Sequence, residues 1–168
     1  MTPPRPVRDS DVEALWALDC LCFEPGISYS RAEIRRFLRL PTARAVAVDG
    51  DGGLAGFAIG YRPRPRRGVI LTLDVHPGER RRGLGRDLLA HLIALLVEDG
   101  ARELTLEVDV GNRGAIRFYE RFGFRVVGRL AAYYGEGRDA FEMEMPAPGL
   151  TAGLRRPEDR DRDRRHPV

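Results

Sequence analysis

Residues 71–96 read LTLDVHPGERRRGLGRDLLAHLIALL, and residues 106–124 read LEVDVGNRGAIRFYERFGF. In the first segment, a β-rich apolar run that ends at Val75 leads through HPGE into three arginines, and glycines at 83 and 85 then open an apolar helix. Glycine lets a ligand approach the backbone closely. The first N–H groups of a helix lack internal partners and carry the positive end of the helix dipole. The segment therefore predicts an anion site that suits a phosphate-bearing ligand.

Two familiar phosphate loops do not fit this segment. A Walker A loop needs Gly-Lys-Ser/Thr, which is not present. A Rossmann fingerprint needs a third glycine, which residues 82–88 lack. Glycine and arginine before a helix also occur in ordinary loops, so this segment by itself leaves a plain connection open.

The two segments together resemble the GNAT N-acetyltransferase family. Arg80-x-x-Gly83-x-Gly85 resembles the family's R/Q-x-x-G-x-G/A loop for the acetyl-CoA pyrophosphate, and Asn112-x-x-Ala115-x-x-x-Tyr119-x-x-x-Gly123-Phe124 resembles its second signature. Tyr133-Tyr134, followed by Gly137-Arg138-Asp139-Ala140 and Met143, is similar to the carboxy-terminal hairpin of the RimI-type protein N-terminal acetyltransferases. The resemblance spans about residues 5–146. It implies an α/β (α+β) GNAT fold, with a mixed, mostly antiparallel seven-stranded sheet that splays to admit the cofactor and has helices on both faces.

The resemblance also implies that the chain binds acetyl-CoA. Its pyrophosphate is expected on backbone N–H groups of residues 81–86, and its pantetheine arm along the strand edge at residues 73–75. The implied set is Leu73, Asp74, Val75, Arg80, Arg81, Arg82, Gly83, Leu84, Gly85, Arg86, Asn112 and Tyr119. From the residues alone, an ordinary strand with a polar end and a simple N-cap at Asn112 remain alternatives. No metal is expected.

Two residues match the catalytic pair of the RimI-type enzymes, Glu107 as general base and Tyr119 as general acid. Glu107 could instead be one of three carboxylates on a solvated strand face, and Tyr119 could be core packing with a satisfied hydroxyl. His76 is a weaker candidate for the base. Tyr133 and Tyr134 are expected to flank the acceptor, or else to be ordinary hairpin aromatics.

The implied reaction is direct transfer, in a ternary complex, to a protein N-terminal α-amine, with a ribosomal protein as the acceptor that the subgroup suggests. The loop at 23–29 and the helix after it are expected to form one wall of the acceptor site. Asp109 stands where RimI-type proteins usually carry Arg, and residues 25–28 lack their Trp. An acetyltransferase for a small amine, such as an antibiotic or polyamine, and a CoA-binding module without catalysis therefore stay open.

Composition favours one globular domain. A chain of 168 residues suits a single core, expected over residues 1–147, and the Arg- and Asp-rich residues 148–168 are expected to be disordered. No run reaches the length of a membrane span and no secretory h-region is present, which predicts a cytoplasmic protein without a membrane partner. The net charge of +3 is too small to indicate nucleic-acid binding. The oligomeric state is left open.

The remaining patterns predict the other elements. Capping boxes at Ser10-x-x-Glu13 and Ser30-x-x-Glu33 begin helices that end near Phe23 and before Pro41. Cys20 and Cys22 are expected as core thiols. Strands are expected at 5–8, 43–48, 54–61, 69–75, 102–110, 124–130 and 140–145, with helices from after Gly85 to about Asp99 and over 113–122, a hairpin turn at 49–53 and a solvated basic turn at 63–67.

Overall fold

The computed structural model describes residues 2–148, so the expected tail from residue 149 onward lies outside the described residues. The sheet has seven strands in the order β1-β2-β3-β4-β5-β7-β6. They are β1 (Arg5–Pro6), β2 (Arg44–Gly50), β3 (Gly53–Arg64), β4 (Arg67–Val75), β5 (Glu103–Asp109), β6 (Arg125–Leu130) and β7 (Ala140–Pro146). The helices are α1 (Val12–Cys22), α2 (Arg31–Leu38), α3 (Leu84–Glu98) and α4 (Arg113–Phe122), with 3-10 turns η1 (Asp9–Asp11) and η2 (Pro77–Glu79). The mixed, mostly antiparallel sheet predicted from the sequence is confirmed.

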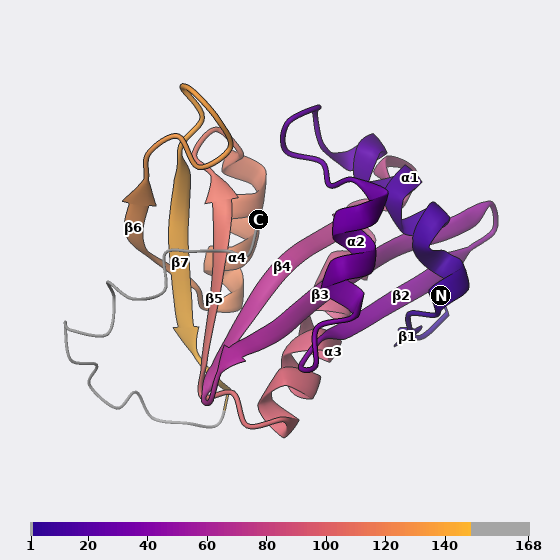
Figure 1. The fold of residues 1–168 in the computed structure, drawn as a ribbon, viewed down its shortest axis with the longest axis horizontal. Helices are drawn as coiled ribbons and strands as arrows, with labels where there is room; N and C mark the ends of the chain where they lie inside the picture. The colour runs from indigo at the N-terminus through magenta and orange to yellow at the C-terminus, as the bar shows by residue number, and fades with distance from the viewer. Residues whose placement is uncertain (1, 149–168) are drawn as a thin grey trace.

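The sheet opens between β4 and β5. Within the described residues, their parallel pairing runs only from Arg67 opposite Glu103 to Val69 opposite Thr105. Beyond that contact, β4 continues to Val75 paired with β3, and β5 continues to Asp109 paired with β7. Figure 1 shows the two halves of the sheet diverging from this contact like the arms of a V. The facing edges of the two strands are therefore available to pair with a ligand.

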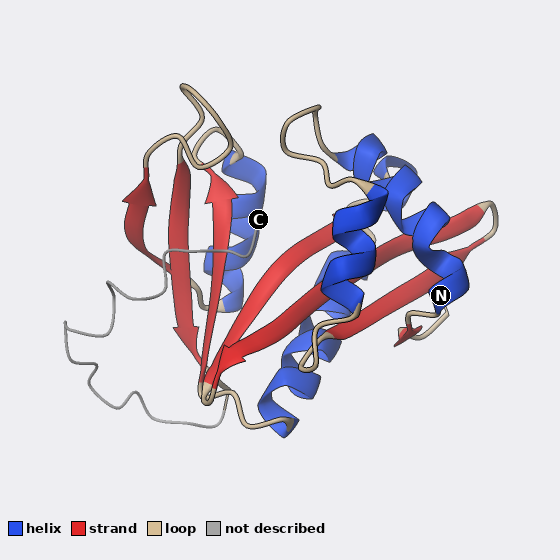
Figure 2. Cartoon of the chain, viewed as in Figure 1, coloured by secondary structure: helices blue, strands red, loops and turns tan. Residues whose placement is uncertain are grey.

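Helices cover both faces of the sheet, and each face has its own apolar core. The face under α3 is filled by Leu88, Leu89 and Leu92, each fully buried. The other face is filled by Leu15 and Ile34, which α1 and α2 pack against the sheet. Figure 2 shows α1 and α2 in front of the sheet and α3 and α4 behind it. This arrangement places helices on both sides of the opening between β4 and β5.

Local signals set most element ends as predicted. The Ser30 capping box forms reciprocally, with Glu33 N donating to Ser30 Oγ (3.2 Å) and Ser30 N donating to Glu33 Oε2 (2.8 Å). The predicted hairpin joins β2 and β3, and Gly123 ends α4 with a φ of 109°. Helix α3 begins at Leu84 rather than after Gly85, because Gly83 takes a left-handed φ of 87° and acts as its N-cap.

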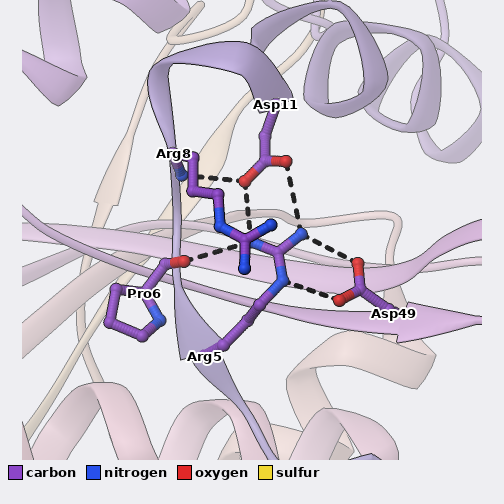
Figure 3. A network of polar contacts seen from close by, with 5 residues as sticks. All are labelled: Arg5, Pro6, Arg8, Asp11 and Asp49. Atoms are coloured by element: carbon purple, nitrogen blue, oxygen red, sulfur yellow. Dashed lines mark hydrogen bonds and ion pairs between the residues drawn. The ribbon is translucent and has the colours of Figure 1, made fainter.

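The capping box predicted at Ser10 does not form. Asp11 is the N-cap of α1, and its carboxylate accepts from Arg8 N (2.8 Å) and Arg5 Nη1 (2.7 Å). The Arg5 guanidinium also donates from Nε to Asp49 Oδ2 (2.7 Å), as Figure 3 shows. Its hydrogen bonds to Asp49 and then Asp11 raise the pKa of Arg5. This network turns the chain into η1 and shortens the strand expected at 5–8 to two residues.

Two expectations about side chains were wrong. Cys20 is exposed, because the buried stripe of α1 passes through Leu15 and Asp19 and each helical residue turns by about 100°. Arg67 is not solvated: its side chain is 14% exposed, and it pairs with Glu142 (3.4 Å) where β4 and β5 meet. Cys22 is half-buried, and its thiol donates to the Val75 carbonyl (3.4 Å).

Neither a membrane-crossing helix nor a metal cluster is found in residues 2–148. Their helices lack the length or the apolar character that a bilayer span requires. In the same residues, no group of three or more His, Cys, Asp or Glu side chains could hold a metal ion.

Candidate active site

A cavity of about 1010 Å³ lies where β4 and β5 diverge. One side is formed by residues 71–73 and 75 of β4 and the start of α3, and the other by residues 107–109 of β5 together with α4. Eleven of the residues singled out in the sequence line it: Leu73, Val75, Arg80, Arg81, Gly83, Gly85, Arg86, Glu107, Asn112, Tyr119 and Tyr134. The fold thus brings the two signature segments and the hairpin to one space.

Four other predicted residues do not line the cavity. The side chain of Asp74 is 1% exposed, and Leu84 is 3% exposed within the α3 core. Arg82 pairs with Glu79 (2.5 Å) outside the cavity. Tyr133 packs edge-on against its neighbour in sequence, with the ring centroids 4.8 Å apart. The resemblance assigns backbone groups of Asp74 and Leu84 to the cofactor, and buried side chains are compatible with that assignment, which stays a prediction.

The loop before α3 has the geometry of an anion site. Arg81 and Gly83 both adopt left-handed φ values, 62° and 87°. The first helical N–H bond of α3 runs from Asp87 to the Gly83 carbonyl (3.1 Å), so the N–H groups of residues 84–86 precede any helical partner. Gly85 and Val75 both line the cavity, and a Cβ added at Gly85 would lie 3.5 Å from Val75 Cγ2. These groups can bind an anionic group through the backbone.

Strand β4 presents its edge to the same space. The Val75 carbonyl accepts from Arg80 Nε (3.0 Å), which shows that this backbone group points away from β3 and toward the opening. Backbone groups alternate in direction along a strand, so those of Leu73 share this orientation. The edge of β4 can therefore hydrogen-bond an extended ligand that runs from the anion loop.

Tyr119 lies on α4 and is half-buried. Its ring packs edge-on against Phe118 and Phe124, with centroids 5.2 and 5.8 Å away. Burial raises the pKa of its hydroxyl, and electrostatic interactions with Asp74 and Tyr134 raise it further. The phenol therefore stays protonated through the neutral range, in the form that can donate a proton. The core-packing alternative holds for the ring, while the side chain also lines the cavity.

Glu107 lies on the opposite wall. The predicted alternative of a solvated strand face does not hold, because Thr105 on the same face is fully buried and Glu107 lines the cavity. The Tyr134 hydroxyl donates to the Glu107 carbonyl (3.4 Å). His76, the weaker candidate for the base, is outside the cavity lining and accepts from Gly78 N through Nδ1 (3.2 Å).

Two loops meet across the mouth of the cavity. Glu24, in the loop between α1 and α2, pairs with Arg138 (3.1 Å) in the loop between β6 and β7. Figure 1 shows these loops facing each other at the open end of the V. Arg138 also lies 3.8 Å from Asp109, the residue that departs from the RimI pattern. Tyr29 lines the cavity beside Glu24, so the loop at 23–29 forms a wall as expected.

A buried pair of carboxyl groups beneath this wall escaped the sequence analysis. Asp19 of α1 and Asp74 of β4 are 0% and 1% exposed, and their carboxyl groups interact with each other. Burial raises the pKa of both carboxyls. A signal was present in the sequence: Asp19 follows Leu15 by four residues and so lies on the apolar face of α1.

Comparison with known proteins identifies one matching protein family. The model of the acetyltransferase (GNAT) family matches residues 12–124. The streptothricin acetyltransferase of Streptomyces lavendulae is 43% identical over 108 residues, which cover 61% of this chain and 57% of that protein. The N-alpha-acetyltransferase MAK3 of Arabidopsis thaliana is 40% identical over 82 residues, which cover 49% of this chain and 43% of that protein. The chain thus spans about half the length of these two relatives.

A solved structure covers more of the chain. The crystal structure of the ribosomal-protein-S18-alanine N-acetyltransferase from Escherichia coli superposes with a TM-score of 0.79 at 26% identity, covering 92% of this chain and 99% of that one.

Proposed function

The chain belongs to the GNAT acetyltransferase family, and we propose that it transfers an acetyl group from acetyl-CoA to the α-amine at the N-terminus of a protein. One observation carries the proposal: the anion loop, Glu107 and Tyr119 all face one cavity in the opening of the sheet. Acetyl-CoA supplies the reactive thioester. The chain's own residues bind both partners, orient them and move the protons.

The cofactor end of the cavity fits a phosphate-bearing, extended ligand. Backbone N–H groups of residues 84–86 lack helical partners there, and Arg81 and Arg86 line the same end. Gly85 leaves the space that a side chain would fill, and the edge of β4 at Leu73 and Val75 offers backbone groups to the amides of a pantetheine arm.

The acceptor end supplies the acid–base chemistry. The Glu107 carboxylate takes a proton from the acceptor ammonium, directly or through one water, and the Tyr119 hydroxyl gives a proton to the leaving sulfur. An α-ammonium is the easier group to deprotonate. Reference pKa values of about 8 and about 10.4 for α-amino and lysine groups differ by about 2.4 units, or roughly 3.3 kcal/mol.

The shape of the mouth favours a chain end. Tyr29 and Tyr134 flank it, and the Glu24–Arg138 pair crosses it. An internal lysine would have to enter with backbone extending in both directions, whereas an N-terminus enters with one chain. The likeness to the Escherichia coli ribosomal-protein-S18-alanine N-acetyltransferase supports a ribosomal protein as acceptor.

Peptide acetylation tests the acceptor class. A short peptide beginning with Ala or Ser should be acetylated at its terminal nitrogen. The same peptide with a blocked terminus and an internal Lys should react far more slowly, because the lysine ammonium has the higher pKa and is harder to deprotonate. Mass spectrometry locates the acetyl group, and acetyl found mainly on lysine would contradict the proposal.

Two substitutions test the catalytic roles. Glu107→Gln and Tyr119→Phe should each lower kcat by roughly 10²–10⁴-fold, the range usual for general acid–base catalysis. Acetyl-CoA should still bind to the Glu107→Gln variant. Glu103→Gln is a matched control, because Glu103 lies on the same strand and face but outside the cavity lining. Wild-type turnover in both test variants at every pH would refute these roles.

A small polycationic amine is the second candidate acceptor. The similarity to the streptothricin acetyltransferase favours it, and so do the carboxylates of Glu24, Glu107 and Asp109 at the acceptor end. Streptothricin, an aminoglycoside and a polyamine should therefore be assayed beside the peptides. Acetylation of these compounds without acetylation of any peptide would establish this candidate and reject the first.

A further inference from the structure

The carboxyl groups of Asp19 and Asp74 join the acceptor wall to strand β4. On one side, Tyr29 N donates to Asp19 Oδ2 (2.7 Å), so Asp19 holds the backbone of a residue that lines the cavity. On the other side, Thr72 Oγ1 donates to Asp74 Oδ1 (2.6 Å), which fixes Asp74 on the strand. The two carboxyls interact with each other between these two anchors, and this interaction links Thr72 to Tyr29 in one chain.

This chain requires a proton. Within the described residues, Asp19 Oδ1 and Asp74 Oδ2 are buried and have no N–H or O–H donor. Two ionised carboxylates side by side in this buried site would leave both oxygens unsatisfied and place two like charges in an apolar setting. A single proton between them satisfies both oxygens and leaves one negative charge, which the Tyr29 N–H and the Thr72 hydroxyl stabilise.

We propose that Asp19 and Asp74 share one proton and act as a positioning pair, which holds Tyr29 against the acceptor as long as that proton is bound. Loss of the proton places two charges side by side, and their repulsion separates α1 from β4. The Tyr29 backbone moves with Asp19, so the acceptor wall loosens. The inference of a shared proton does not depend on the proposed function, whereas the effect on acceptor binding rests on it.

The groups around the pair do not change charge in the neutral range. Glu33 of α2 is held ionised, since hydrogen bonds from Ser30 lower its pKa, and the positive charge of Arg80 lies beside Asp74. Burial raises the pKa of the Cys22 thiol and of the Tyr29 and Tyr119 hydroxyls, which therefore remain neutral. Among these groups, the pair is the one whose charge responds to pH in the neutral range.

Nuclear magnetic resonance of the full chain without ligands tests the shared proton. The Tyr29 amide proton should show one titration step above the ordinary aspartate range, because its acceptor oxygen belongs to the pair and burial raises the pKa of both carboxyls. Asp74→Asn should abolish the step, since an amide N–H replaces the shared proton permanently. Thr72→Val should move the step to higher pH, because the lost hydroxyl favoured the ionised form. An unchanged step in Asp74→Asn would overturn the proposal.

Kinetics with the Ala-initiated peptide test the positioning role. Asp19→Ala removes the acceptor of the Tyr29 N–H and should raise the peptide KM about tenfold, the usual scale of one lost hydrogen bond, while the KM for acetyl-CoA stays the same. Asp19→Asn keeps a carbonyl oxygen for Tyr29 and should restore most of the loss. Because it carries no shared proton, its peptide KM should also vary less with pH than that of the wild type.

The outcomes separate the two proposals. If no peptide is a substrate, the proposed function fails, while the Tyr29 titration still decides whether the proton is shared. If peptides react but their KM is the same in Asp19→Ala and the wild type, the positioning role is refuted. If Asp19→Ala does not fold, the KM of Asp19→Asn across the pH range decides in its place.

Discussion

Raising the pH should weaken the fold through the Asp19–Asp74 pair, and Asp74→Asn should remove that dependence. An aspartate in the unfolded chain loses its proton near pH 3.9. Burial raises the pKa of both carboxyls in the folded state, so above about pH 5 the folded chain binds more protons than the unfolded chain. The stabilisation is fully present below the unfolded pKa. It is lost as the pH rises through the folded pKa values of the pair.

The size of the effect follows from the proton count. One extra proton in the folded state lowers the free energy of unfolding by about 1.36 kcal/mol for each pH unit. Two pH units therefore cost about 2.7 kcal/mol, a large part of the roughly 5–15 kcal/mol typical of a domain. Asp11 and Glu33 do not contribute here: hydrogen bonds, from Arg5 and Ser30 respectively, lower their pKa values and keep both ionised.

Urea unfolding measures this slope. The chain's single Trp, Trp16 on α1, packs under the Arg31 guanidinium at 3.4 Å and should report unfolding by fluorescence. The free energy of unfolding would be compared between the wild type and Asp74→Asn from about pH 5.5 to 9, below the titration of the buried tyrosines. Parallel lines for the two proteins would refute the reasoning, because the variant retains every other titrating group.

Three further outcomes are expected. Gly83→Asp should abolish acetyl-CoA binding, as measured by calorimetry. Gly83→Asn, which tolerates the left-handed φ better and adds no charge, should bind acetyl-CoA more tightly than Gly83→Asp does. Equal affinities of the two variants for acetyl-CoA would contradict an anion site. Leu88→Ala should lower the free energy of unfolding by about 2–5 kcal/mol in urea titrations, since Leu88 is fully buried; a loss below about 1 kcal/mol would contradict the core assignment. Arg138→Ala should raise the peptide KM by opening the mouth, while stability changes by less than about 1 kcal/mol, because Glu24 is 79% exposed; an unchanged KM would exclude a role in the mouth.

Much of the fold could be predicted because its signals act over a few residues. A left-handed glycine at 83 and another at 123 begin and end helices through local backbone geometry, and the capping box at Ser30 closes within one turn. The Ser10 box has the same pattern and does not form. Its neighbour Asp11 instead binds Arg5, which also reaches Asp49 on a distant strand, and such competition is invisible in a local pattern.

The candidate site divides in the same way. The sequence by itself determined the anion loop and the two signature segments, because these depend on residue types at fixed short spacings. Alternation along β5 placed Glu107 on a face, but alternation does not say whether a face meets solvent or a cavity. Only the divergence of β4 from β5 made that face a wall. The Asp19–Asp74 pair and the Glu24–Arg138 contact likewise join segments distant in sequence, and burial and charge pairing at such distances exist only once the chain has folded.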